Sequence, residues 1–304
     1  MILPQDFTDT IQNTFGRKGS RFLTSLPDLI NEASRRWDIT DIRAVPNLSY
    51  NFVAFAKHGD QEVVLKIGVP NKELTSEITA LSLFAGRGSV RLLEADKNHG
   101  MFLLERLHPG EMLATLKDDE QATNLAAEVM LSLWQPAPVN DALIQLSDWF
   151  KGFEKLRARY DGSTGPLDKA LVERAEGAVK EFFAEDYAPM LIHGDLHHFN
   201  ILSSSRGWLA IDPKGVIGPA AYDVGPLLIN PWGFKPWKDL HDRADILRLT
   251  KRRIAILSDR LSIEAERIRL WGLAHAVLSA WWSLDANEAW EYAMDCASLL
   301  ASIK

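Results

Sequence analysis

Three polar residues in the second half of the chain have the types and the spacing that phosphoryl transfer requires. Asp195 and Asn200 lie five residues apart in HGDLHHFNIL, and Asp212 follows twelve residues later in WLAIDPKG. Transfer from a magnesium nucleotide needs one carboxylate that orients the acceptor hydroxyl and receives its proton. It also needs an amide oxygen and a second carboxylate to hold Mg²⁺ against the phosphates, since Mg²⁺ prefers oxygen ligands. The spacing therefore indicates kinase chemistry.

Short buried strands are expected to position these residues. Met190 to Ile192 form an apolar run that ends just before the polar loop, and Trp208 to Ile211 form another that ends in Asp212. Asp-Pro on its own would favour a simple turn. A polar loop at the end of a buried strand, however, is where catalytic groups are commonly displayed.

The histidines of the same loop suggest an alternative, a zinc hydrolase built on His193, Asp195, His197 and His198. Zinc sites need three or four ligands that converge with fixed geometry. No second histidine-rich motif follows, because the other histidines stand alone: His58, His99, His108, His241 and His275. The zinc interpretation is therefore the weaker one.

The first hundred residues predict two helical runs followed by a small sheet. Apolar residues at helical spacing run from Phe7 to Phe15 and from Phe22 to Trp37, and Pro27 is expected near a helix start. From about residue 41 the pattern predicts strand, strand, strand, helix, strand, strand. A second His-Gly-Asp, at residues 58–60, lies between two of these strands and is expected to be a hairpin turn.

After residue 107 the pattern becomes mainly helical. Apolar residues at helical spacing predict helices around residues 125–133, 149–160 and 167–182, and further helices from about residue 237. The fold class is therefore α+β with two lobes. We expect a β-rich lobe at residues 1–107, with the N-terminal helices, and a helical lobe at 108–304 that carries the loop of Asp195 and an acceptor pocket.

Composition limits the partners of the 304-residue chain. Its net charge of -7 argues against nucleic acid, because binding to phosphates needs basic patches. Its single cysteine, Cys296, excludes a disulfide within the chain and suits the cytoplasm. We expect no signal peptide, since MILPQDFTDT lacks a basic region and an apolar run, and no membrane span, since the most apolar late segment is only 12 residues long. The oligomeric state cannot be inferred.

The catalytic segment resembles that of a known family. His193-Gly194-Asp195 through Asn200, with Asp212, resembles the catalytic loop and metal-binding aspartate of the protein-kinase-like fold. The glycine after the histidine is similar to the aminoglycoside phosphotransferase branch. DLHHFNIL, GWLAIDPKG and AYDVG are closer still to the streptomycin 6-phosphotransferase and hydroxyurea phosphotransferase family. The resemblance extends from about residue 45 onward and implies the bilobal protein-kinase-like fold.

The resemblance implies a role for each matching residue of the loop. Asp195 would be the catalytic base, and Asn200 and Asp212 would bind Mg²⁺. His193 would brace the loop. Asp223 in AYDVG is expected to hold the loop through backbone hydrogen bonds.

In the small lobe the resemblance implies a nucleotide site. Lys66 in VVLKIG would hold the α- and β-phosphates of ATP, with Glu77 as its partner and Glu73 as the alternative. Glu105, Arg106 and Leu107 would form the hinge that binds the adenine edge. The loop before Lys66, VPNLSYNF, has no glycine, so the amides of Ser49 and Tyr50 and the Ser49 hydroxyl are the candidate phosphate contacts. GTP remains open as an alternative to ATP.

A small hydroxyl-bearing acceptor fits better than a protein, since Asp223 follows Asp212 by only eleven positions. By resemblance the acceptor is a cationic aminoglycoside such as streptomycin, whose guanidinium groups would pair with carboxylates. The candidate carboxylates are Asp239, Asp285, Glu288, Glu291 and Asp295.

Two alternatives remain, a metabolic kinase of another small hydroxyl compound (a sugar, an amino alcohol or a hydroxyurea-like molecule) and an inactive nucleotide-binding regulatory module. The roles of His197, His198 and Lys214 stay open. The late tryptophans Trp271, Trp281, Trp282 and Trp290 are expected in the core.

Overall fold

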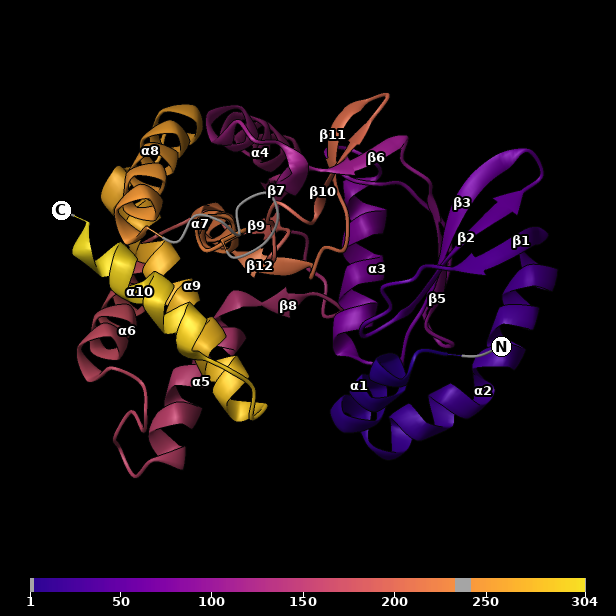
Figure 1. Cartoon of the computed structure of the whole chain (residues 1–304), viewed down its shortest axis with the longest axis horizontal. Coiled ribbons are helices and arrows are strands. Elements are labelled where there is room, and N and C mark those ends of the chain that lie inside the picture. Colours follow the sequence, from indigo (N-terminus) through magenta and orange to yellow (C-terminus); the bar gives the residue numbers. More distant parts are fainter. Residues whose placement is uncertain (1–2, 233–241, 304) are drawn as a thin grey trace.

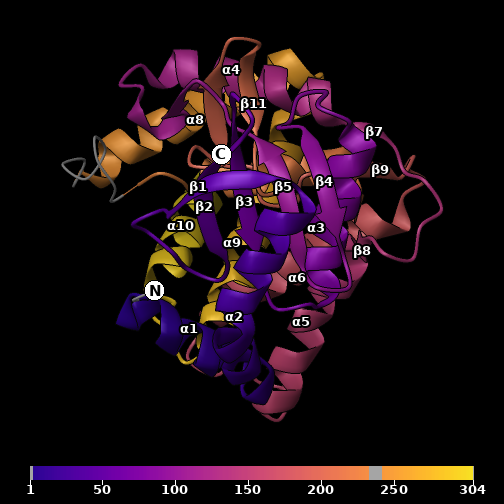
Figure 2. The same cartoon turned by 90° about the vertical axis from the view of Figure 1, so that its right-hand side faces the viewer.

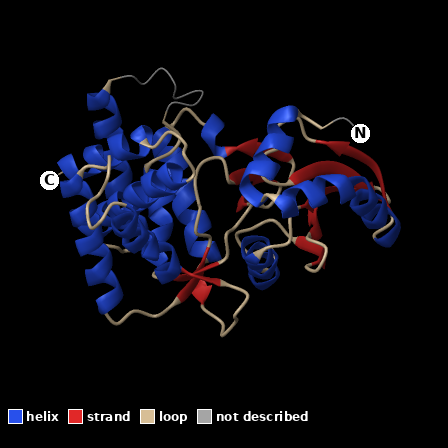
Figure 3. Cartoon of the chain, turned by 90° about the horizontal axis from the view of Figure 1, so that it is seen from below, coloured by secondary structure: helices blue, strands red, loops and turns tan. Residues whose placement is uncertain are grey.

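A computed structural model describes residues 3–232 and 242–303, and its N-terminal lobe is a five-stranded antiparallel sheet covered by helices (Figures 1 and 3). The strand order is β1-β2-β3-β5-β4. The strands are β1 (Ile39–Ala44), β2 (Phe52–His58), β3 (Gln61–Ile67), β4 (Leu92–Asp96) and β5 (Met101–Glu105). The helices are α1 (Gln5–Phe15), α2 (Arg17–Arg36) and α3 (Lys72–Phe84). The predicted order of strands and helix is confirmed.

The alternation of side chains along β3 explains where Lys66 points. Val63, Leu65 and Ile67 pack in one apolar cluster with α1 and α2, whereas Val64 packs in the cluster that contains residues of α3. Successive side chains of a strand point to opposite faces, so Lys66 shares the α3 face with Val64. Helix α3 lies between the sheet and the helical lobe (Figure 1). The face that carries Lys66 is therefore the one turned toward the rest of the chain.

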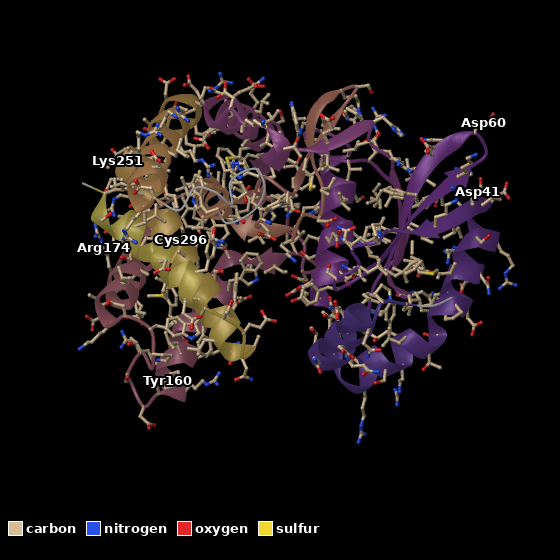
Figure 4. The ribbon with its side chains drawn as sticks, in the orientation of Figure 1. Asp41, Asp60, Tyr160, Arg174, Lys251 and Cys296 are labelled. Carbon is tan, nitrogen blue, oxygen red and sulfur yellow. The ribbon has the colours of Figure 1, made fainter. Side chains whose placement is uncertain are left out.

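The first His-Gly-Asp copy is a hairpin turn, as predicted. His58 pairs with Gln61, which leaves Gly59 and Asp60 as the two turn residues, and Gly59 has a φ of +58°. Figure 4 shows Asp60 at the tip of the β2–β3 hairpin, at the opposite end of the molecule from Arg174 in the helical lobe. This copy has no part in a site between the lobes.

The helical lobe is built around a large apolar core that includes the buried Trp271 and Trp281. Its helices are α4 (Asp119–Leu133), α5 (Leu146–Arg159), α6 (Lys169–Ala184), α7 (Val224–Leu228), α8 (Arg243–Leu261), α9 (Ala265–Asp285) and α10 (Glu291–Ser302). Two 3-10 turns also occur, η1 (Leu113–Thr115) and η2 (Ala220–Asp223). The predicted bilobal α+β fold is confirmed.

Two small sheets hold the loop that contains Asp195. One has the order β11-β10-β6 and the other β7-β9-β12-β8. Their strands are β6 (Pro109–Met112), β7 (Gln135–Pro136), β8 (Ile144–Gln145), β9 (Met190–Ile192), β10 (Ile201–Ser204), β11 (Gly207–Ala210) and β12 (Val216–Gly218). Strand β9 has the predicted bounds. Strands as short as β7 and β8 carry no periodic pattern, which is why the sequence did not indicate them.

Two sequence expectations about segment limits need comment. Pro27 lies inside α2 and not near its start, because α1 and α2 are separated only at Gly16. Figure 2, in which the N-terminal lobe faces the viewer, shows these two helices packed together beside the strands. The division at residues 107 and 108 stays a prediction; it falls between β5 and β6.

In the described part of the chain, no helix combines the length and the apolar character needed to cross a bilayer.

Candidate active site

Lys66, Glu77 and Asp212 meet between the two lobes. Lys66 Nζ lies 2.6 Å from Glu77 Oε1 and 3.1 Å from Asp212 Oδ1. Lys66 and Glu77 are buried, whereas the side chain of Asp212 is 48% exposed. Helix α3 presents Glu77 toward β3, and the alternative partner Glu73 is exposed one turn away. The structure thus brings together a strand, a helix and a loop that are far apart in the sequence.

The electrostatics of this triad keep Asp212 ionised. Burial alone would raise the pKa of Asp212, but the charge and hydrogen bond of Lys66 outweigh it and lower that pKa. Burial would likewise lower the pKa of Lys66, but Asp212 and Glu77 raise it. The pKa of Glu77 is raised, mainly by burial. The site therefore holds a fixed ammonium beside an exposed carboxylate.

Asp223 fixes the backbone of the loop that contains Asp195. Its buried carboxylate accepts hydrogen bonds from the backbone N–H groups of His193 at 3.0 Å and Gly194 at 2.7 Å. The indole N–H of Trp134 donates a third, at 3.0 Å. Burial raises the pKa of Asp223 to about 6. The sequence interpretation of Asp223 as a structural anchor agrees with these contacts.

His193 connects the two halves of the site. Its Nε2 lies 2.8 Å from the carbonyl oxygen of Ile211, and its Nδ1 accepts the backbone N–H of Asp195 at 3.1 Å. Burial lowers the pKa of His193 to about 3, so the ring is neutral and Nε2 carries the proton that Ile211 accepts. The ring therefore ties Asp195 to the strand that precedes Asp212.

Two glycines are required by close approach. Gly194 has a φ of +87°, and a Cβ there would lie 2.5 Å from Val216 Cγ2. Gly215 has a φ of +66°, and a Cβ there would lie 2.6 Å from the carbonyl oxygen of Ser76. Ser76 Oγ also donates to the Gly215 carbonyl at 2.7 Å, a contact between α3 and the loop after Asp212. Nothing in the sequence pointed to Ser76.

Asp195 and Asn200 are partly exposed on the same loop. Asn200 Nδ2 donates to the backbone carbonyl of Asp195 at 3.0 Å, which fixes the amide. Burial raises the pKa of Asp195, although electrostatic interaction with His197 and Lys214 opposes that shift. The side chain of Asp195 is 34% exposed, so its carboxylate can meet a small molecule.

The remaining loop residues have different surroundings. His197 Nε2 lies 3.6 Å from Asp195 Oδ1. His198 is fully buried, and neither of its ring nitrogens has a hydrogen-bond partner among the described residues. The backbone N–H of Lys214 donates to the His193 carbonyl at 2.8 Å, and Lys214 electrostatically favours the ionised forms of Asp212 and Asp195. The backbone of Lys214 thus connects the segment after Asp212 to the loop that contains Asp195.

The loop histidines do not form a zinc centre in the described structure. In residues 3–232 and 242–303, one group of three side chains places potential ligand atoms within 4.8 Å of one another. That group is Glu32, Asp96 and His99 in the N-terminal lobe. Arg36 already pairs with Asp96 there. The zinc-hydrolase alternative therefore has no geometric support at Asp195.

The predicted nucleotide contacts are less closely assembled. Ser49 and Tyr50 are both exposed in the loop between β1 and β2. Leu107 is buried, and the carboxylate of Glu105 accepts the backbone N–H of Arg91 at 2.8 Å. The backbone N–H of Glu105 donates to the Arg91 carbonyl at 3.1 Å, so this amide is not free for a ligand. The binding roles of all four residues stay predictions.

The acidic candidates and the late tryptophans divide into groups. Asp285 pairs with Arg159 at 3.1 Å, Glu288 and Glu291 are exposed, and Asp295 lines a cavity of about 260 Å³ beside α10. Asp239 lies outside the described residues.

Trp271 and Trp281 are buried and Trp290 is half-buried, but Trp282 is 38% exposed, so its prediction as a core residue is wrong.

Sequence comparison shows the family. The pattern of the aminoglycoside/hydroxyurea antibiotic resistance kinases matches residues 36–287. The chain belongs to this family. It is 30% identical to the streptomycin 6-kinase of Streptomyces glaucescens, over 94% of this chain and 92% of that one. It is 28% identical to the hydroxyurea phosphotransferase of Kitasatospora aureofaciens, over 94% of this chain and 81% of that one.

Structural comparison shows the same fold. The aminoglycoside phosphotransferase APH(4)-Ia, solved as a ternary complex with ADP and hygromycin B, aligns with a TM-score of 0.60 at 15% identity. The alignment covers 91% of this chain and 97% of that one. The predictions of the family, of the protein-kinase-like fold and of a phosphotransferase are confirmed.

Proposed function

We propose that the protein transfers the γ-phosphoryl group of ATP to a hydroxyl of an aminoglycoside-like acceptor, in the manner of a streptomycin 6-kinase. The observation that carries the proposal is the meeting of Lys66 with Asp212 at 3.1 Å, beside the braced loop of Asp195, in a member of this kinase family. The similarity to two streptomycin 6-kinases over more than nine-tenths of the chain supports the choice of acceptor.

Asp195 is the proposed catalytic base. Its carboxylate is partly exposed and its position is fixed through His193 and Asp223. It would orient the acceptor hydroxyl and take its proton as the hydroxyl oxygen attacks the γ-phosphorus and the bond to the β-phosphate oxygen breaks. No covalent phospho-enzyme is needed. Lys66, held by Glu77, would bind the α- and β-phosphates, and Lys214 would face the transferred group.

The donors at this site fit Mg²⁺. Asp212 offers an ionised, half-exposed carboxylate, and Asn200 offers its amide oxygen because its amide nitrogen is bonded to the Asp195 carbonyl. Both are hard oxygen ligands, and one or two such ligands suffice when phosphate oxygens and water complete the shell. Bound Mg²⁺ would neutralise negative charge on the phosphates.

ATP is the proposed donor, with GTP as the alternative. The hinge of Glu105, Arg106 and Leu107 would bind the adenine edge through backbone groups other than the Glu105 N–H. Ser49 and Tyr50 would contact the phosphates, which requires their exposed loop to approach the nucleotide. The use of a nucleoside triphosphate as phosphoryl donor and the presence of a single cysteine support a cytoplasmic location.

A second small hydroxyl acceptor has specific support. The similarity to a hydroxyurea phosphotransferase, over 94% of the chain, favours a hydroxyurea-like molecule as the runner-up.

The test is an assay of ADP release with streptomycin, other aminoglycosides, hydroxyurea and small hydroxylated metabolites, with mass spectrometry of the products. Streptomycin phosphate is the expected product. If only another compound is phosphorylated, that compound replaces streptomycin as the proposed acceptor. If none of the compounds is phosphorylated, the proposal is contradicted.

A further inference from the structure

Trp149 lies directly beside the residue that precedes Asp195. A Cβ placed on Gly194 would be 3.1 Å from Trp149 Cη2, so the indole ring borders the loop at this point. Trp149 stands in the first turn of α5 and is half-buried. Its ring is thus next to the loop that carries Asp195, at the residue directly before it.

Trp282, on α9, extends this aromatic surface outward. Its ring centroid lies 5.4 Å from that of Trp149 with an interplanar angle of 86°, an edge-to-face pair. It is 38% exposed, whereas its neighbour Trp281 is buried. Trp282 therefore carries the aromatic surface of Trp149 from the loop of Asp195 out to solvent.

Buried aromatic residues hold the pair in place. Tyr222 lies 6.0 Å from Trp149, centroid to centroid, and its hydroxyl is 2.9 Å from His275 Nδ1. His275 in turn lies 6.4 Å from Trp282. Burial lowers the pKa of His275 to about 3, so its ring is neutral and adds no positive charge behind the two indoles. The two indoles therefore pack against a neutral aromatic pair on the inner side.

Charge and ring chemistry favour a cation on this surface. The face of an indole ring attracts ammonium and guanidinium groups. The partly exposed carboxylate of Asp195 attracts the same groups. Trp149 borders the loop of Asp195, and the acceptor hydroxyl must lie at this loop if Asp195 is to take its proton.

We propose that Trp149 and Trp282 form an aromatic platform that binds an ammonium or guanidinium group of the acceptor and so places the neighbouring hydroxyl at Asp195. This inference rests on the proposed function, and it names aromatic faces as determinants of acceptor specificity. Asp285, one of the candidate carboxylates, is already paired with Arg159.

The test compares Trp282→Ala with Trp208→Ala. Trp208 is half-buried and lies in the β10–β11 hairpin, opposite Ser203, so it serves as a control for loss of a partly accessible indole outside the platform. Trp282→Ala should raise the KM for streptomycin on the order of tenfold, the range expected for a cation–π contact, and leave the KM for ATP unchanged. Trp208→Ala should change neither. Trp149→Phe keeps a ring in the core and should give a smaller rise.

Calorimetric titration of the same proteins separates this inference from the proposed function. Streptomycin and tetramethylammonium serve as probes, and uncharged hydroxyurea shows whether the effect needs a charge. Binding of streptomycin without turnover would contradict the proposed reaction, while its loss in Trp282→Ala would still support the platform. Equal affinity of Trp282→Ala and the unaltered protein for both cations, or no binding of either, would overturn the platform.

Discussion

Replacement of Asp223 by alanine should destabilise the protein through the loop that contains Asp195. The carboxylate accepts from the backbone N–H groups of His193 and Gly194 and from Trp134 Nε1, all within 3.0 Å. Asp223→Ala leaves three donors without an acceptor, and each such buried donor costs about 1–3 kcal/mol. The free energy of unfolding should therefore fall by roughly 3–9 kcal/mol where Asp223 is protonated.

The loss should depend on pH in a defined direction. Burial raises the pKa of Asp223 from 3.8 to about 6, so its contribution is fully present below pH 3.8 and declines as pH rises through 6. The pKa difference corresponds to about 3 kcal/mol. The gap in unfolding free energy between the protein and Asp223→Ala should thus narrow by about 2–3 kcal/mol between pH 4 and pH 8.

Urea unfolding at pH 4, 6 and 8, followed by tryptophan fluorescence, measures this gap. Asp245→Ala is the control, because the side chain of Asp245 is 47% exposed and pairs with the exposed Arg248, a contact worth about 0–1 kcal/mol. A loss below about 1 kcal/mol for Asp223→Ala, or a gap that widens with pH, would refute this reasoning.

The remaining predictions concern the phosphate side of the site and the loop. Lys66→Met should raise the KM for ATP and lower the free energy of unfolding by about 3 kcal/mol, because it leaves Glu77 buried without its cation. Steady-state kinetics measure the KM, and urea unfolding measures the stability. An unchanged KM for ATP would contradict the role of Lys66 in phosphate binding. Lys214→Ala should lower kcat about 100-fold with little change in ATP affinity, as expected for loss of one electrostatic contact to a transition state. An equal loss of ATP affinity would show that Lys214 contributes to ground-state binding of ATP. Gly194→Ala should abolish most activity and unfold at a lower urea concentration than Gly59→Ala. Both glycines have positive φ, but of the two only Gly194 has atoms within 4 Å of a new Cβ. Equal stability of the two variants would disprove the packing argument.

The sequence allowed the local parts of the site to be predicted. The apolar run before the loop, the residues at its end and the turn at Gly59 depend on patterns a few residues long, and the structure has β9 at Met190–Ile192 as expected. The partnership of Lys66 with Glu77 followed from a family resemblance, and the structure places the two groups 2.6 Å apart.

Contacts between distant segments could not be predicted in this way. Ser76 meets Gly215 across 139 residues, and no local pattern marks either partner of that hydrogen bond. Trp281 and Trp282 are adjacent and of the same type, yet one is buried and the other exposed. Which of them faces solvent depends on how α9 packs against the rest of the lobe, and this is tertiary information. Pro27 shows the same limit, because α2 extends on both sides of it.

The most direct test of the proposed reaction is Asp195→Asn, assayed for streptomycin phosphorylation and for ATP binding. Asparagine has nearly the same shape as aspartate but cannot accept the hydroxyl proton, so kcat should fall by a factor of about 100 or more. ATP affinity should stay within about threefold, because Lys66 and Asp212 are untouched. Loss of product with ATP binding retained is the predicted result. Undiminished turnover by Asp195→Asn would contradict the account.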